Sequence, residues 1–411
     1  MSTYEDASLI YYPSGVKAGK AYSLKPTDGS GDLTFTRAST ATRVNAEGLI
    51  ESVATGVPRI DYTGGGCGKL LLEPQRTNVI LRSEEFDNAA WSTNNSSVSA
   101  NTTTSPDGTT NADSLIEDTS NNLHQLAQST TATGGIYTAS IYVKANGRNW
   151  IALNIAAAGS YSAFFDIQNG VVGTIQANIT SASITSVGNG WYRCVVVANT
   201  GAIAPRISIS MSTGNNIFSY LGDGTSGVYL YGAQLELGSY STSLIKTTST
   251  AVTRVKDTSG TSGLSSLINS SEGTLYVEIR ALANDQTERY ITLNDGSNTN
   301  VVRIGYFVTN PNQILYQVNA SGLQTNVLTT DYTISDFNKI AVTWKLNEFK
   351  LFINGVQVGA TDTSGTPPIG LNTLAFGNVV GLNQPFYGEN KGVMVFPTAL
   401  SNAELETLTT L

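Results

Sequence analysis

Hydrolysis of a glycosidic bond would need a pair of acidic side chains. The spacing of the acidic residues in this chain argues against such a pair. Glu84 and Glu85 are adjacent, and adjacent residues of a strand point to opposite faces of its sheet. They therefore cannot flank one glycosidic bond, as hydrolysis by a carboxylate pair requires. Glu278 is alone on its predicted strand, and Glu389 lies beside Gly388 in a predicted turn. We predict no catalytic residues and expect that the protein is not an enzyme.

The single histidine and the two cysteines give no other catalytic arrangement. His124 has no nucleophile elbow nearby, so we predict an ordinary surface histidine. Cys67 lies in a glycine-rich turn and Cys194 in a predicted strand, and both are predicted to be free thiols. Two cysteines and one histidine are also too few for an ordinary zinc site.

Side chains that could bind a sugar are more numerous. An aromatic ring can pack against the apolar face of a sugar, while amides and carboxylates hydrogen-bond its hydroxyls. In the middle of the chain the candidates are Trp150, Asn154, Tyr161, Tyr220 and Asp223. In the C-terminal part they are Asn294, Asp295, Tyr306, Asn378, Asn383 and Tyr387. A structural role is the alternative for each of them.

The elements that would position these residues are strands. Apolar and polar residues alternate over 137–144 and 206–212, which predicts half-buried strands. Residues 228–237 read as a long strand in which Gly232 is placed for a bulge. Residues 273–280, 339–345, 348–356 and 392–396 predict further strands. One helix is expected near the C-terminus, where Ser401 and Glu404 have capping-box spacing.

The composition favours an all-β protein and excludes several partners. Charged residues make up 13% of the chain and its net charge is −8, so no basic stripe is available for nucleic acid. No apolar run approaches the roughly 18 residues of a membrane span, and we expect no membrane insertion. The first residues have neither a basic start nor an apolar core, so they are not expected to be a signal peptide.

These patterns predict two antiparallel β-sandwiches of the jelly-roll type in tandem, after an irregular N-terminal anchoring segment. We expect an N-terminal arm over residues 1–76 and a first sandwich over 77–246. A linker rich in Ser, Thr and Gly would span 247–271, and a second sandwich 272–411.

Several segments resemble known families. Residues 33–43 (LTFTRASTATR), 45–50 (NAEGLI), 70–78 (LLLEPQRTN), 82–91 (RSEEFDNAAW), 229–238 (YLYGAQLELG) and 242–247 (TSLIKT) resemble phage tail-fibre and head-fibre proteins. In that family they bracket a jelly roll like those of carbohydrate-binding modules. The strand order from residue 272 to 411 resembles the laminin-G/concanavalin-A-like family, whose members usually bind and do not react.

The resemblance implies a bacteriophage head- or tail-fibre subunit, made in the host cytoplasm and displayed on the virion surface. It implies a homotrimer that contacts other virion proteins through its N-terminal region and adheres to host or environmental glycans. It also allows a structural calcium ion held by Glu84 or Glu85 with Glu236. The alternatives are a purely architectural decoration of the capsid or tail and, from kinship of fold alone, a glycan-degrading enzyme.

Overall fold

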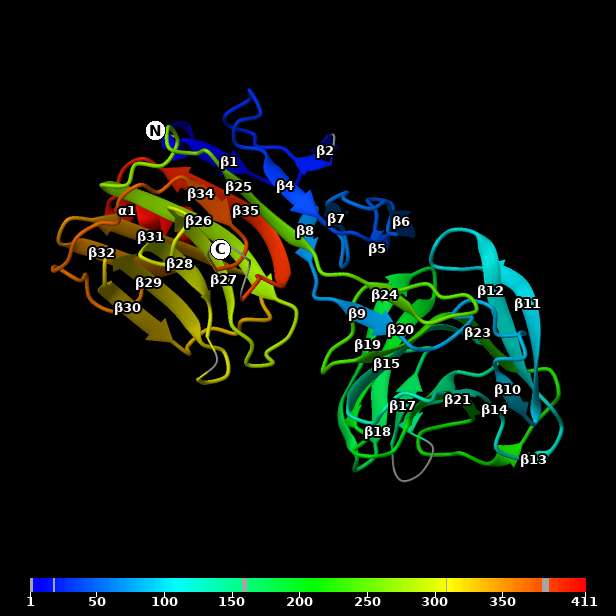
Figure 1. Ribbon diagram of the computed structural model, residues 1–411. Coiled ribbons are helices and arrows are strands. Elements are labelled where there is room, and N and C mark those ends of the chain that lie inside the picture. Colours follow the sequence, from blue (N-terminus) through cyan, green and yellow to red (C-terminus); the bar gives the residue numbers. More distant parts are fainter. Residues whose placement is uncertain (1–2, 18, 157–160, 308, 379–383) are drawn as a thin grey trace.

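The computed structural model describes residues 3–17, 19–156, 161–307, 309–378 and 384–411. The chain forms two lobes, each a sandwich of antiparallel sheets, as Figure 1 shows. This confirms the predicted all-β class with two jelly-roll sandwiches.

The lobe built from the middle of the chain is named here the inserted lobe. One of its sheets has the strand order β10 (Ser92–Asn94), β14 (Gln125–Ser129), β21 (Pro205–Ser212), β16 (Trp150–Ala156), β17 (Ser162–Asp166) and β18 (Val171–Ile175). The other has the order β11 (Ser96–Thr104), β12 (Thr110–Glu117), β23 (Gly227–Leu237), β15 (Ile136–Asn146), β20 (Trp191–Asn199) and β19 (Ile179–Gly188). A short pair, β13 (Asn121–Asn122) with β22 (Tyr220–Leu221), lies beside them. The core between the sheets includes Ile151, Leu153 and Ile209, all without exposed surface.

The other lobe, named here the framing lobe, also has two sheets. The first has the order β33 (Val356–Gln357), β32 (Glu348–Ile353), β31 (Asn338–Lys345), β26 (Glu272–Ala281), β35 (Gly388–Phe396), β8 (Lys69–Leu72) and β7 (Arg59–Asp61), with β1 (Leu9–Tyr11) also paired to β35. The second has the order β2 (Val16–Lys17), β3 (Lys20–Ala21), β4 (Leu33–Thr36), β25 (Thr258–Ser262), β34 (Thr373–Ala375), β27 (Arg289–Asn294), β28 (Asn300–Tyr306), β29 (Ile314–Ala320) and β30 (Leu323–Thr329). A 3-10 helix η1 (Thr3–Asp6) and the helix α1 (Asn402–Thr409) complete this lobe.

The strand pairing differs from the expected division of the chain. Residues 1–76 do not form a separate arm, because six of their strands extend the two sheets of the framing lobe. Leu9, Phe35 and Leu70 belong to the same buried core as Leu275 and Val395. Local sequence patterns cannot reveal this arrangement, because β1, β4 and β8 connect it to partner strands hundreds of residues away.

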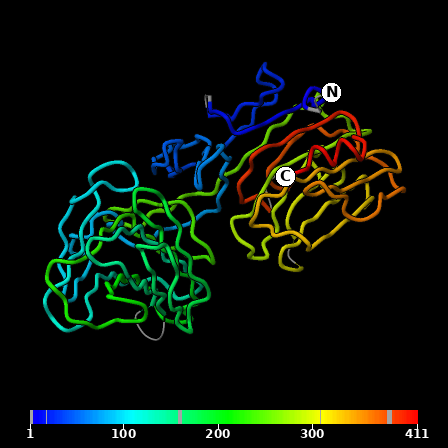
Figure 2. The backbone as a smooth tube through the Cα atoms, turned by 180° about the vertical axis from the view of Figure 1, so that it is seen from behind, coloured from blue at the N-terminus to red at the C-terminus, as the bar shows by residue number. Residues whose placement is uncertain are grey.

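The segment expected to be a linker is also structured. Its strand β24 (Val252–Arg254) pairs with β9 (Arg76–Asn78), and β25 joins β4 to β34. The chain therefore leaves the framing lobe along β9 and returns beside it along β24. Figure 2 shows the N-terminal blue trace and the C-terminal red trace together in one lobe, with the cyan and green trace forming the other.

Two local expectations are confirmed. Gly232 has a φ of +61° beside a register shift between β15 and β23, which is the expected bulge. Ser401 caps α1 in a capping box with Glu404.

Buried charges fill the junction between the lobes. Arg59 has no exposed surface, and it pairs with Glu73 at 2.5 Å and with Asp257. Arg254 lies 2.9 Å from Glu73, and the hydroxyl of Ser243 in the inserted lobe also donates to Glu73. Burial alone would raise the pKa of Glu73, but Arg254, Arg59 and Ser243 outweigh it and lower that pKa to about 2. A hydrogen-bonded ion network therefore connects segments on both sides of the insertion.

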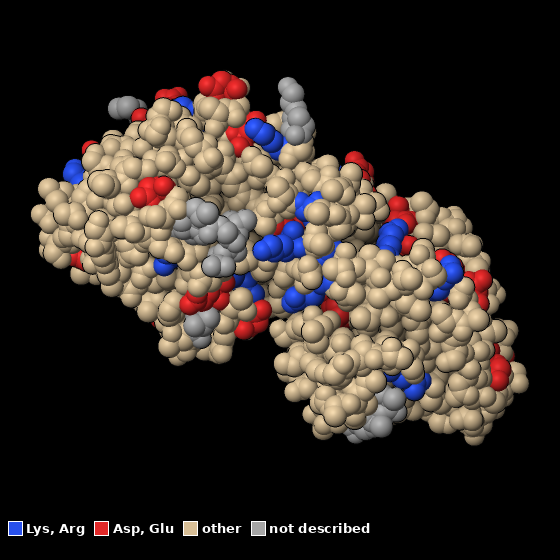
Figure 3. Space-filling view, viewed as in Figure 1, with Lys and Arg blue, Asp and Glu red and all other residues tan. Residues whose placement is uncertain are grey.

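Figure 3 shows Lys and Arg side chains gathered near the place where the two lobes meet, with Asp and Glu side chains scattered over both lobes. The strands β5 (Ala41–Val44) and β6 (Ile50–Val53) form a hairpin that lies against the inserted lobe. Its residue Ile50 packs in one cluster with Tyr142 and Tyr231.

Candidate functional site

In the inserted lobe the sheet that contains β21 has six strands, and the other has eight because β9 and β24 also pair in it. A groove runs across the outer face of the six-stranded sheet. Strand alternation explains its chemistry, because Ile207, Ile209 and Met211 of β21 enter the core while the residues between them face outward. The groove encloses about 320 Å³. It is lined by Leu123, Gln125, Asn154, Ala156, Ser162, Gln176, Arg206, Ser208, Ser210 and Phe218.

The groove has a charged end and an apolar end. Arg206 and Ser210 are four residues apart on β21, which places them about 13 Å apart along the strand. Gln125 pairs with Ser210, and the half-buried Phe218 lies edge-on to Phe164 with ring centroids 4.8 Å apart. The site therefore combines an aromatic surface, small polar floor residues and one cation.

Amide side chains are held in place along the floor. Asn154 donates to the hydroxyl of Ser162 at 3.1 Å and accepts from the amide of Ala156 at 3.0 Å. The side-chain oxygen of Gln176 accepts from the amide of Ser162 at 3.0 Å. These bonds orient the amides, so that a ligand would meet donors and acceptors in fixed positions.

Arg206 is the electrostatic feature of the groove. Partial burial lowers the pKa of its guanidinium, although arginine stays charged under all ordinary conditions. Its Nε is buried and has no hydrogen-bond partner among the residues that the structure describes. The groove lining contains no Asp, Glu or His among those residues, so the groove has a net positive charge.

Asn154 is the predicted sugar-binding residue that lines this groove. Trp150 is on the same face of β16, four residues away, but its half-buried ring is turned onto Gly173, where an added Cβ would lie 2.6 Å from it. Tyr161 is half-buried and packs against the core of the lobe.

Tyr220 and Asp223 have structural partners instead of an open surface. Tyr220 is 8% exposed, donates its hydroxyl to Glu117 at 2.7 Å and stacks against His124. Asp223 accepts from the hydroxyl of Ser226 and from the backbone amides of Ser226 and Thr225 in an exposed turn, and these bonds lower its pKa. The expectation of a surface position for His124 is wrong, because its ring is fully buried.

In the framing lobe, Asn294 and Asn378 line one open groove of about 440 Å³. Its other lining residues are Thr34, Thr36, Thr258, Ser259, Gly260, Thr261, Ser262, Gly296, Thr373, Leu374 and Ala375. No aromatic side chain is among the described residues that line it. It therefore lacks the ring surface for a sugar that Phe218 provides in the groove of the inserted lobe. Asp295 is next to this groove and holds a turn through the amide and hydroxyl of Ser297.

The remaining candidates of the framing lobe are not among the described residues that line this groove. Tyr306 is 1% exposed and belongs to the core, so it cannot present its ring to a ligand. Tyr387 is half-buried, and burial is the main cause that raises its pKa to about 12. Asn383 lies outside the described residues.

The three glutamates expected at a calcium ion do not fit such a site. Glu84 pairs with Lys246 at 2.9 Å and Glu85 with Arg82 at 2.8 Å. Glu236 is fully buried, and its oxygens already accept from the amide and hydroxyl of Thr242 and from Gln234. Within the described ranges, no three His, Cys, Asp or Glu side chains are grouped to hold a metal ion.

Arg206, Phe218 and Gln125 were not among the predicted site residues. The strict alternation over 206–212 does contain a signal, because it places Arg206 on the outward face with three serines. Phe218 follows two asparagines in a loop, and nothing in its neighbourhood predicts that the loop folds over the sheet.

Comparison with known families covers part of the framing lobe. Residues 256–406 match the family model Laminin_G_3, described as the concanavalin A-like lectin/glucanases superfamily. No curated protein matches the chain. None of the helices in the described part of the chain is long and apolar enough to cross a membrane.

Solved structures that share local similarity include carbohydrate-binding domains. The CBM40 of the Ruminococcus gnavus IT-sialidase, bound to α2,3-sialyllactose, has 15% identity over 34% of this chain and 83% of its own, with a TM-score of 0.30. Domain 4 of AbnA, a GH43 arabinanase from Geobacillus stearothermophilus in complex with arabinotriose, has 14% identity over 38% and 73%, with a TM-score of 0.27. These scores are too low to carry an argument about a shared site.

Proposed function

We propose that this chain is a glycan-binding protein and that the groove of the inserted lobe is its binding site. The observation that carries the proposal is the combination of Phe218, oriented amides and Arg206 on one exposed sheet face. Aromatic contact with oriented hydrogen-bond partners is what recognition of a sugar requires. The match of residues 256–406 to a lectin-type family supports the same function.

The role we propose is binding without catalysis. Hydrolysis of a glycosidic bond needs a carboxylate pair at the bond, and the described lining of the groove has none. The test is incubation of the protein with the polysaccharide that it binds, followed by an assay for new reducing ends. Release of reducing ends would contradict the proposal.

The biological setting that we propose is the surface of a bacteriophage, as a subunit of a head or tail fibre or spike. This rests on the resemblance of segments such as residues 70–78 to phage fibre proteins. It includes a homotrimer that contacts other virion proteins through the N-terminal strands of the framing lobe. Light scattering of the purified protein would test the trimer, and a monomer at all concentrations would contradict it.

Binding itself is tested on a glycan array and on host polysaccharide with the intact chain. We expect the double variant Asn154→Ala/Arg206→Gln to lose at least tenfold in affinity, because it removes an oriented amide and the cation. A matched control is Asn326→Ala, which removes an exposed amide on β30 of the framing lobe. Equal binding by the wild type and the double variant would reject this groove as the site.

A further inference from the structure

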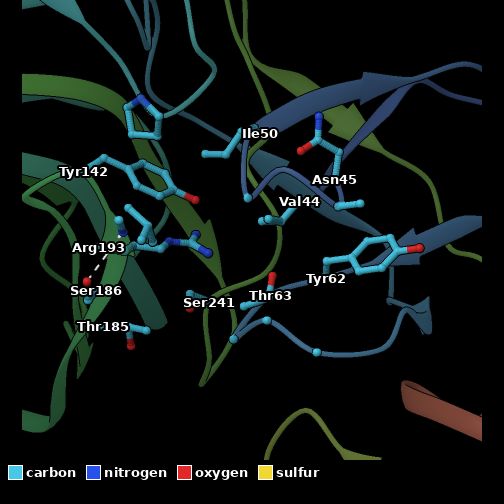
Figure 4. Close-up of a pocket in the computed structure, with 18 of the residues that line it drawn as sticks. Val44, Asn45, Ile50, Tyr62, Thr63, Tyr142, Thr185, Ser186, Arg193 and Ser241 are labelled. Atoms are coloured by element: carbon cyan, nitrogen blue, oxygen red, sulfur yellow. Dashed lines mark hydrogen bonds between the residues drawn. The ribbon is translucent and has the colours of Figure 1, made fainter.

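A third and larger cavity lies where the hairpin β5–β6 meets the inserted lobe. It encloses about 490 Å³, within the range of small-molecule sites. One wall is the hairpin β5–β6 with the loop that follows β7, and the other is the outer face of β15, β20 and β19. Figure 4 shows Val44 and Ile50 of the hairpin facing Tyr142 and Arg193 of the inserted lobe.

Arg193 is the cation of this cavity, and most of its donors are unused. Its Nη2 donates to the hydroxyl of Ser140 at 2.9 Å and to the carbonyl of Thr242 at 2.7 Å. Its Nε is buried without a partner, and no hydrogen bond joins Nη1 to the described residues. Three of the five N–H groups of the guanidinium are therefore unpaired within the described part of the chain.

Neither Asp61 nor Glu73 forms an ion pair with Arg193 in the described part of the chain. Asp61 accepts from the backbone amides of Val44 and Thr63, both at 2.8 Å. Glu73 is held by the buried arginines of the lobe junction. The guanidinium of Arg193 lies over the ring of Tyr142, 5.3 Å from its centroid, so the ring orients it and does not neutralise it.

The rest of the lining suits a hydroxylated ring. In Figure 4 the guanidinium of Arg193 and the hydroxyl of Tyr142 both point into the space that faces the hairpin. Hydroxyls of Thr63, Ser183 and Ser241 also line the cavity, while Val44, Ile50 and Pro106 supply an apolar wall. Hydroxyl partners, one apolar wall and one unneutralised cation together match a sugar that carries a carboxylate.

We propose that this cavity binds a monosaccharide-sized acidic sugar, whose carboxylate pairs with Arg193 and whose ring packs between the hairpin and the outer face of β20. This site is separate from the groove on the six-stranded sheet, so it does not depend on the proposed function. Because both walls contact the ligand, binding would also hold the hairpin against the inserted lobe.

The probes are glucuronate, galacturonate and N-acetylneuraminate, with glucose and galactose as neutral counterparts of the first two. Binding to the full chain is measured by saturation-transfer NMR and calorimetry. We expect at least one acid to bind, a neutral counterpart to bind at least tenfold more weakly, and Arg193→Gln to abolish binding. Binding of none of the acids, or equal binding of acid and neutral sugar, would overturn the proposal.

Two further variants separate this site from the groove and from misfolding. Thr185 is exposed at the cavity, so Thr185→Trp should fill it without disturbing the core and should also abolish binding. Arg206→Gln removes the cation of the other site and should leave acid binding unchanged. If Arg206→Gln removes acid binding while Arg193→Gln and Thr185→Trp retain it, the acid binds in the groove and the cavity proposal is wrong.

Discussion

A single carboxylate, Glu73, holds two buried arginines at the junction between the lobes. It contacts Arg59 and Arg254 and accepts two hydrogen bonds from Ser243. Replacing a buried ion pair by apolar residues can be neutral, but removing one partner leaves a charge uncompensated. The cost of changing Glu73 is therefore expected to exceed that of changing an exposed carboxylate.

We expect Glu73→Gln to lower the free energy of unfolding by about 3–5 kcal/mol. The matched control is Glu51→Gln, which breaks the partly exposed pair with Arg43 and should cost about 1 kcal/mol or less. Urea denaturation followed by fluorescence measures both. Similar losses for the two variants would show that the junction network does not stabilise the fold.

The lowered pKa of Glu73 also makes the stability of the folded chain depend on pH. The pKa of Glu73 is lowered from its ordinary value of 4.5 to about 2 in the folded chain, because Arg254, Arg59 and Ser243 outweigh the opposing effect of burial. A carboxyl with a depressed folded pKa contributes stability that is complete above its unfolded pKa and is lost as pH falls. We expect Glu73 to contribute a loss of stability between about pH 4.5 and pH 2, and Glu73→Gln to flatten that part of the profile.

Single residues of the site were only partly predictable from the sequence. Asn154 was predicted because an amide close in sequence to an aromatic side chain, Trp150, suggests a sugar contact. Arg206 lies in an alternating strand that was recognised, but its lack of a partner depends on the neighbouring strands of the sheet. Tyr306 was predicted to contact a sugar, but its ring is buried. Only the packing of the whole lobe decides whether an aromatic ring is exposed to a ligand or belongs to the core.

Among the elements, β23 lies between β12 and β15 in one sheet and contains a bulge at Gly232. Gly232 has a φ of +61°, and an added Cβ would lie 3.0 Å from Leu244 and 3.1 Å from Tyr142. The bulge therefore needs a residue without a side chain, both for its backbone conformation and for close packing.

We expect Gly232→Ala to destabilise the inserted lobe by about 2 kcal/mol, from backbone strain and overpacking together. The control is Gly214→Ala, whose Cβ would meet only Ile217 at 3.4 Å and which has no positive φ. Thermal unfolding measures the difference. An unchanged midpoint for Gly232→Ala would mean that the bulge tolerates a side chain.

The strands with strong alternation were predictable, and so were the bulge and the capped helix. The short strands of residues 9–72 were not, because each has four residues at most. Of these strands, β1, β4 and β8 also pair with strands far along the chain. Register between such segments depends on the shared core, and a local pattern does not determine it.

At the scale of the whole molecule, one sandwich is inserted into the other. The strands that leave and re-enter the framing lobe are antiparallel neighbours, with Asn78 paired to Val252. Residues 79–251 can therefore be replaced by a short turn without separating the ends of the framing lobe.

We expect a chain in which a short turn rich in Gly and Asn replaces residues 79–251 to fold as the framing lobe alone. A fragment starting at residue 256 should fail to do so, because it lacks the core contributions of Leu9, Phe35 and Leu70. Circular dichroism and cooperative denaturation of the shortened chain and of the fragment test this. A stable fragment from residue 256 would show that the N-terminal strands are dispensable.

The paired strands β9 and β24 also determine how the molecule would respond to mechanical force. Tension applied to a sugar held in the inserted lobe must reach the framing lobe through these two neighbouring strands and the contacts around Glu73. The force would be divided between the two strands, because they are neighbours and each is covalently joined to both lobes. Under such tension the ion pairs of Glu73 with Arg59 and Arg254 would share the load with the two backbone connections.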